Sequence, residues 1–274
     1  MRFDNILLLS DLDGTFLNDE VKPVKANIDA VNRFAQNGGL FSVASGRPPK
    51  SALRYISECK VNFPAVTYNG AMVYDFEKKQ PVMSLMPSDE VRKIAYDVYL
   101  RYADKVGFLA YYENDLVTIK ANEYSLVMKP FEALNFKEIT DYSLFPNGIY
   151  KYLYVAQPET IKEMLAVFES EYAGRLRFTS AGKNFIELLA PGADKGSMME
   201  KLVKSRPDVK TVIAIGDYYN DICILEKADI KVAVKGAPKE LLDIADYVTK
   251  KTNNEGAVAD LIDNLEEILS GKAR

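Results

Sequence analysis

The stretch that decides the fold is Asn5–Thr15, which reads NILLLSDLDGT. Its apolar half, Ile6–Leu9, has the branched, uncharged character of a strand that is buried on both faces of a sheet. Two carboxylates, Asp11 and Asp13, follow directly after this run. Such neighbours repel each other, and each is costly to remove from water. A solvated turn explains Gly14 and one aspartate, but it does not explain why the pair begins where the strand ends.

The bulk composition limits the class of protein. The chain has 274 residues, 48% hydrophobic and 27% charged, which is ordinary for a globular protein of one large or two average domains. The net charge of -4 and the lack of a basic stripe argue against a nucleic-acid partner. No apolar run approaches the ~18 residues of a membrane helix, and the N-terminus lacks the features of a signal peptide. We therefore expect a soluble, cytoplasmic protein without a membrane partner.

Histidine is absent from the chain. This excludes Ser-His-Asp and Cys-His catalysis and every zinc site that needs a histidine ligand. Any catalytic acid or base must therefore be Asp, Glu, Lys, Tyr or Cys.

Strand-like runs recur along both ends of the chain, and helical patterns such as Lys25–Asn37 lie between most of them. After the first strand, the runs are Leu40–Ser45, Ala65–Asn69, Thr211–Gly216 and Ile230–Val234. This alternation predicts an α/β fold with a Rossmann-like, mostly parallel sheet. We expect this core to comprise residues 1–82 and 188–274.

The middle of the chain has a different pattern. Two turn signals, Glu113-Asn114-Asp115 and Ser180-Ala181-Gly182-Lys183, each lie between two strand-like runs and predict antiparallel hairpins. A helical pattern at Glu159–Tyr172 lies between these hairpins. Residues 83–187 are therefore expected to form an α+β domain that is inserted into the core.

Polar residues follow each predicted strand of the core, and the carboxyl ends of parallel strands meet at one edge of a sheet, where ligands bind. Lys195, in GADKGS, begins the helix that leads into the fourth strand. The residues expected at this edge are Asp11, Asp13 and Thr15 after the first strand, Ser45 after the second, Asn69 and Gly70 after the third, and Asp217, Asn220 and Asp221 after the fourth.

Four carboxylates at one edge need a compensating charge. A hard divalent cation with oxygen ligands supplies it, and Mg²⁺ suits a site that has few carboxylates and keeps bound water. The spacing does not match a calcium-binding EF-hand loop, and neither a Walker A loop nor a GxGxxG fingerprint is present. A cation, Lys195, Ser45 and a carboxylate nucleophile are the parts that phosphoryl transfer requires.

Four motifs in this order resemble those of the haloacid dehalogenase superfamily of phosphohydrolases. They are DLDGT at 11–15, SGR at 45–47, DKG at 194–196 and GDYYND at 216–221. NGA at 69–71 and NFIELLAPGADKG at 184–196 are similar to the Cof-type subfamily, which carries a large α+β (C2-type) cap. The similarity extends over essentially the whole chain, and it makes residues 83–187 the cap that closes over the substrate and sets specificity.

The resemblance implies roles for the four aspartates. Asp11 is the nucleophile that becomes an aspartyl-phosphate and also a metal ligand. Asp13 is the general acid and then the base for water, and its backbone carbonyl meets Mg²⁺. Asp217 ligates the metal directly. Asp221 acts through water or by orienting Lys195, although it could instead cap the helix expected at 222–227.

The remaining motif residues are expected to bind substrate. Ser45 and Lys195 hold the phosphoryl group, and Gly46, Arg47 and Asn220 complete the contacts. Other interpretations stay open for some of them: Ser45 could be a helix N-cap before Pro48, Lys195 a surface lysine, and Arg47 part of a surface salt bridge.

The function that follows is a Mg²⁺-dependent phosphatase of small phosphorylated metabolites, with sugar phosphates as the expected class. Two alternatives are a phosphomutase that uses the same aspartyl-phosphate and a sugar-phosphate sensor that only binds. The segment Val232–Ala237 reads VAVKGA where relatives often read VAMGNA. This departure, centred on Lys235, bears on substrate choice more than on chemistry.

Overall fold

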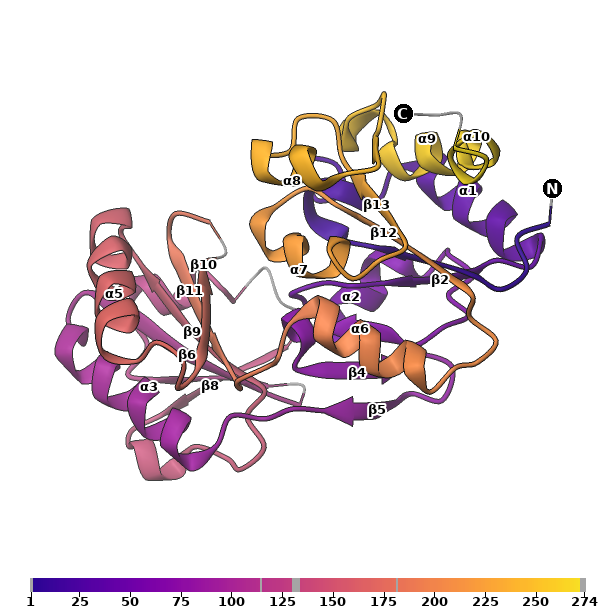
Figure 1. Cartoon of the computed structure of the whole chain (residues 1–274). Helices are drawn as coiled ribbons and strands as arrows, with labels where there is room; N and C mark the ends of the chain where they lie inside the picture. The colour runs from indigo at the N-terminus through magenta and orange to yellow at the C-terminus, as the bar shows by residue number, and fades with distance from the viewer. Residues whose placement is uncertain (1, 114, 130–133, 181, 272–274) are drawn as a thin grey trace. The chain divides into compact units, whose positions relative to one another are not determined.

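The structure is a computed structural model that describes residues 2–113, 115–129, 134–180 and 182–271 (Figure 1). The chain divides into two compact units, one formed by Met1–Met83 and Asp194–Arg274 and the other by Ser84–Ala193. Each unit has its own cluster of buried apolar side chains. Asn114 and Ala181, which belong to the two predicted hairpin turns, lie outside the described residues.

A five-stranded parallel sheet forms the centre of the first unit, in the order β14-β13-β12-β1-β2. β1 lies between its neighbours, because Leu8 pairs with Phe41 on one side and Ile213 on the other. The predicted parallel α/β core is confirmed. The strands are β1 (Ile6–Ser10), β2 (Leu40–Val43), β12 (Thr211–Gly216), β13 (Ile230–Ala233) and β14 (Tyr247–Val248).

The third predicted strand is shorter than expected and pairs differently. β3 (Ala65–Thr67) pairs with β4 (Met72–Asp75) in a separate three-stranded sheet that β5 (Gln80–Ser84) completes. A single parallel bridge, Ala44 to Val66, joins it to the end of β2. The chain turns away at once because Tyr68 and Asn69 have positive φ angles. The fifth strand of the parallel sheet is instead β14, which has two residues and gives no sequence signal.

Helices cover the sheet of the first unit. In α1 (Lys25–Gln36), Ile28, Val31 and Phe34 fall on one face and are buried. This helix lies beside α9, which α10 follows (Figure 1). The other helices of this unit lie between the strands in the chain or follow the last strand. Their bounds are α2 (Pro49–Ile56), α6 (Lys195–Lys204), α7 (Ile222–Leu225), α8 (Lys239–Ile244), α9 (Ala257–Asp263) and α10 (Leu265–Leu269).

The second unit is an antiparallel sheet in the order β10-β11-β9-β6-β7-β8, except that β7 and β8 run parallel. Aromatic rings, among them Phe108, Tyr154 and Phe168, pack between this sheet and α3 and α5. The α+β character expected of the insertion is confirmed. Its elements are α3 (Asp89–Tyr102), β6 (Val106–Tyr112), β7 (Asp115–Ile119), α4 (Glu123–Leu126), β8 (Asn135–Ile139), β9 (Lys151–Ala156), α5 (Pro158–Glu171), β10 (Arg177–Ser180) and β11 (Phe185–Leu189). In the part of the chain described here, no helix combines the length and apolarity needed to cross a membrane.

Candidate active site

The candidate site lies at the carboxyl ends of the parallel strands in the first unit. Asp11 directly follows β1, Asp217 directly follows β12, and one residue separates Ser45 from the end of β2. Lys195 is the first residue of α6 and reaches the same edge. The structure therefore brings the sequence-predicted residues of these motifs together, as strand adjacency requires.

The turn after β1 is shaped by a close approach to Asp217. The backbone N–H of Asp11 donates to the Ile215 carbonyl at 3.0 Å, which extends the β1–β12 ladder by one residue. Gly14 has a φ of 76°, and a Cβ there would lie 2.3 Å from an oxygen of Asp217. Both facts require glycine at this position. Thr15 then donates from its hydroxyl to the Asp217 carboxylate at 2.7 Å and fixes its orientation.

Lys195 is buried with only 1% of its surface exposed, which excludes a surface lysine. Its Nζ lies 2.7 Å from Oδ1 of Asp11 and 2.6 Å from Oδ1 of Asp221. Burial by itself lowers the pKa of a lysine, but the two carboxylates outweigh it and raise the pKa of Lys195. The ammonium group therefore stays charged and links the DLDGT loop to the GDYYND loop.

Asp221 is fully buried and organises the loop that carries Asp217. Its Oδ2 accepts hydrogen bonds from the backbone N–H groups of Asp217 and Tyr218 at 3.1 and 3.2 Å. Asp221 does stand at the N-cap position of α7, as the alternative interpretation expected, but its side chain makes no capping hydrogen bond to that helix. Asp221 thus holds Lys195 with one oxygen and the loop backbone with the other.

Three carboxylates lie close together here, and two of them contact Lys195. Ligand oxygens of Asp11, Asp217 and Asp221 lie within 4.8 Å of one another. Burial raises the pKa of Asp11 well above its usual range, and neighbouring carboxylates add to the shift while Lys195 opposes it. Burial and then Asp221 raise the pKa of Asp217 to about 7. A donor set of carboxylate oxygens with excess negative charge fits a hard divalent cation such as Mg²⁺.

Arg47 forms a two-pronged ion pair with Asp13. Its Nε and one terminal nitrogen lie 2.7 and 2.6 Å from the two carboxylate oxygens. Its other terminal nitrogen donates to Ser51 at 3.2 Å, and the guanidinium lies 4.7 Å from the centre of the Tyr55 ring. The Arg47 side chain is 13% exposed and that of Asp13 is 50% exposed, so the salt bridge left open as an alternative is formed, and it is partly exposed. The sequence reasoning missed Ser51 and Tyr55. Their spacing could have indicated them, because Ser51 lies one helical turn after Arg47 and Tyr55 lies one helical turn after Ser51.

Ser45 and Asn69 connect the remaining motifs. Ser45 is 1% exposed, and its hydroxyl accepts from the backbone N–H of Arg47 at 3.2 Å. The N-cap of α2 is Pro48, so the N-cap interpretation of Ser45 is wrong. A Cβ at Gly46 would lie 2.9 Å from the amide nitrogen of Asn69, and Asn69 accepts from the Asn220 side chain at 3.3 Å. Asn69 therefore belongs to the site as well as to a tight turn.

Residues 8–262 match the haloacid dehalogenase-like hydrolase family. The chain belongs to this family. It is 28% identical over 286 residues to the 5-amino-6-(5-phospho-D-ribitylamino)uracil phosphatase YwtE of Bacillus subtilis, covering 96% of this chain and 97% of the relative. It is 25% identical to YcsE, a phosphatase of the same name in that organism, over 93% of this chain and 94% of the relative.

Solved structures agree with this assignment. The crystal structure of a haloacid dehalogenase-like hydrolase from Bacteroides thetaiotaomicron has a TM-score of 0.84 and 25% identity, and the match covers 94% of this chain and 98% of that one. Together with the phosphatase names of the relatives, it shows that this hydrolase is a phosphatase.

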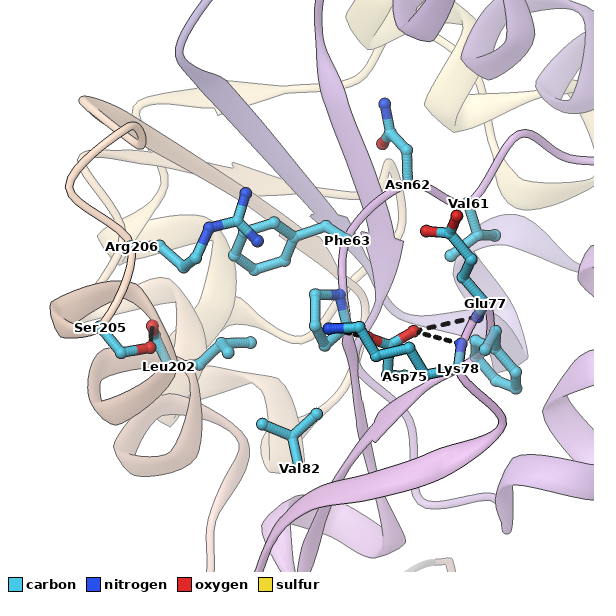
Figure 2. Close-up of a pocket in the computed structure, with 12 residues that line it drawn as sticks. Val61, Asn62, Phe63, Asp75, Glu77, Lys78, Val82, Leu202, Ser205 and Arg206 are labelled. Carbon is cyan, nitrogen blue, oxygen red and sulfur yellow. Dashed lines mark hydrogen bonds and ion pairs between the residues drawn. The ribbon is translucent and has the colours of Figure 1, made fainter.

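A separate pocket of about 360 Å³ in this haloacid dehalogenase-like hydrolase lies at the other end of α6 (Figure 2). It is bounded by residues 61–64 before β3, by residues 75–78 after β4, and by the last turn of α6 with Arg206. The Arg206 guanidinium covers the Phe63 ring at 4.6 Å, as Figure 2 shows. None of the motif residues lines this pocket, and Lys195 begins α6 at the opposite end.

Proposed function

We propose that this phosphatase depends on Mg²⁺ and hydrolyses small phosphorylated metabolites, sugar phosphates in particular, through an aspartyl-phosphate on Asp11. The observation that carries the proposal is the placement of Asp11, 7% exposed, against Lys195 and two further carboxylates. The names of two relatives specify a phosphate ester on a ribityl chain. Such an ester is a small phosphorylated polyol, which is close in chemistry to a sugar phosphate.

The first step would be an in-line attack by a carboxylate oxygen of Asp11 on phosphorus. An Asp11–phosphorus bond forms while the bond from phosphorus to the leaving oxygen breaks. Lys195 directs Asp11 and neutralises charge on the phosphoryl oxygens, and the buried Ser45 hydroxyl donates a hydrogen bond to one of them. Water then attacks the aspartyl-phosphate and releases inorganic phosphate.

The residues that would hold Mg²⁺ are Asp11, the backbone carbonyl of Asp13, and Asp217, with Asp221 acting through water. When bound, the cation compensates these carboxylates and the phosphoryl oxygens. Thr15 holds the Asp217 carboxylate in one orientation through its 2.7 Å hydrogen bond.

Asp13 would give a proton to the leaving oxygen and later take one from the attacking water. Both of its carboxylate oxygens are engaged by Arg47 in this structure. Asp13 can carry a transferable proton only after one oxygen leaves that contact. An incoming phosphoryl group is a competing acceptor for the same guanidinium, so substrate binding would free the acid at the moment that it is needed.

A phosphate-release screen over phosphorylated metabolites tests this proposal. We expect turnover of sugar phosphates in the presence of Mg²⁺. This turnover should stop in excess chelator and return when Mg²⁺ is added back. Full activity in chelator would end the metal requirement. A demand for a bisphosphate activator would favour the phosphomutase, and binding without turnover of any ester would favour the sensor.

A further inference from the structure

Two large aromatic side chains stand in solvent within the GDYYND loop. Tyr218 is 40% exposed and Tyr219 is 48% exposed, whereas Asp221 in the same loop is fully buried. Neither ring is needed to hold the carboxylates, because Asp221 fixes that backbone through its own hydrogen bonds. A contiguous exposed apolar patch is one of the features that mark a ligand-binding surface.

Both rings are held in place before any ligand arrives. The backbone N–H of Tyr218 donates to Asp221 at 3.2 Å. The rings of Tyr218 and Tyr219 meet edge to face, with centroids 5.0 Å apart and an interplanar angle of 74°. The turn Tyr219–Asp221, which Tyr219 begins, packs beside α8. The edge-to-face contact therefore lets the Tyr219 ring support the ring of Tyr218.

The leaving group of a substrate must pass over the loops that surround the phosphoryl group. Tyr218 directly follows Asp217, which is tied to Thr15 in the nucleophile loop at 2.7 Å. An aromatic face packs well against a flat partner, such as the C–H face of a pyranose or the plane of a heterocycle. An open polyol chain offers no flat face.

We propose that Tyr218 is a specificity-determining contact for the leaving group, with Tyr219 as its positioning residue, and that the pair favours phosphate esters whose leaving group contains a ring. The proposal rests on the proposed function and adds to it the shape of the substrate.

Glucose 6-phosphate and sorbitol 6-phosphate provide the test, because they share the carbon count and the primary phosphate and differ in ring closure. The wild-type enzyme should show the higher kcat/KM for the ring. Tyr218→Ala should lower the ratio of the two kcat/KM values about threefold to tenfold, while Tyr218→Phe keeps it. The change should appear in KM and leave kcat unaltered, because a contact remote from phosphorus binds ground state and transition state alike. Tyr219→Ala should give a smaller change in the same direction.

Two results would overturn the inference: an unchanged ratio in Tyr218→Ala, or an equal fall of kcat for both esters, which indicates damage to the carboxylate loop. Calorimetric binding of both esters to Asp11→Asn, with and without Tyr218→Ala, separates this inference from the proposed function. The inference is supported if Asp11→Asn binds glucose 6-phosphate more tightly than sorbitol 6-phosphate and the added Tyr218→Ala removes this difference. This holds even if the wild type turns over neither ester. Equal affinity for both esters in Asp11→Asn contradicts it.

Discussion

Each compact unit buries a lysine, and the surroundings of the two ammonium groups differ. In the first unit, Lys195 meets Asp11 and Asp221, and Asp217 lies in the same cluster. Within the described residues, these aspartates are the one group of three metal-capable side chains whose ligand atoms converge.

In the second unit, Lys151 begins β9 and reaches Glu187 on the neighbouring strand β11. The two charged groups are 2.6 Å apart, and Nζ lies 4.4 Å from the centre of the Tyr111 ring. Both charged side chains are less than a tenth exposed. Burial and a short ion pair are therefore common to both units. What distinguishes the candidate active site is an excess of carboxylates, which calls for a further cation and suits a phosphate ligand once that cation is bound.

The largest expected effect is on turnover, and it distinguishes Asp11, the partner of Lys195, from Glu187, the partner of Lys151. Asp11→Asn should lower turnover at least about 10³-fold, because an amide is a poor nucleophile. Without Mg²⁺ it should also raise Tm, since it removes a costly buried charge. Glu187→Gln should instead lower Tm, because it weakens a buried ion pair, and should leave kcat on p-nitrophenyl phosphate near the wild-type value. Turnover above a few per cent in Asp11→Asn would sink the covalent mechanism.

The two lysines give the next contrast. Lys195→Met should lower kcat on the order of 10²–10³-fold by removing charge beside the nucleophile. Lys151→Met should leave kcat on p-nitrophenyl phosphate intact and lower the free energy of unfolding by about 3–5 kcal/mol, because Glu187 loses a buried partner. Steady-state kinetics give kcat for both variants, and urea unfolding gives their free energies of unfolding. A loss of kcat in Lys151→Met with normal stability would break the comparison.

A pair of arginines tests whether the Asp13 contact matters for turnover. Arg47→Lys keeps the charge and loses the fork, so kcat/KM for sugar phosphates should fall about tenfold. Arg206 forms a similar fork with Asp208, at 2.9 and 2.7 Å, beside the pocket of Figure 2. Arg206→Lys is the matched control and should leave kcat/KM unchanged. Equal kcat/KM values for sugar phosphates in the two variants would show that Arg47 does not contribute to turnover.

The smallest effect is a shift of Tm with pH in excess chelator. A carboxyl group whose folded pKa is raised contributes stability that is complete below its unfolded pKa and is lost as pH rises through the folded pKa. For Asp217 that folded pKa is about 7, and the pKa of Asp11 is raised as well. Tm should therefore fall by a few degrees between about pH 5 and pH 8. Asp217→Asn should flatten the slope, and a rising Tm in the wild type would contradict the assignment.

The convergence of the motif residues could be predicted because each motif lies in the loop just after a strand or at the start of a helix. Because β1, β2 and β12 are neighbouring parallel strands, the residues that follow Ser10, Val43 and Gly216 must lie at the same edge of the sheet. The roles of those residues, the metal and the boundaries of the cap remain predictions.

Side-chain partners could not be predicted in the same way. Arg47 reaches Asp13 across 34 residues of sequence, and many acceptors compete for a guanidinium. β14 escaped notice because two residues carry no periodicity. The pairing of β3 depended on the positive φ angles at Tyr68 and Asn69. Asn69-Gly70 is a turn signal, but a turn signal does not say which strand β3 pairs with.

The central strand has a consequence for how the protein is made. β1 pairs with β2, through Leu8 and Phe41, and with β12, through Leu8 and Ile213. During synthesis the second neighbour leaves the ribosome about 10–40 s after β1, at ordinary elongation rates. Throughout that interval one edge of β1 lacks its native neighbour, while the whole segment Ser84–Ala193 emerges and can fold first. Among the strands of this parallel sheet, β1 therefore waits longest for a native neighbour.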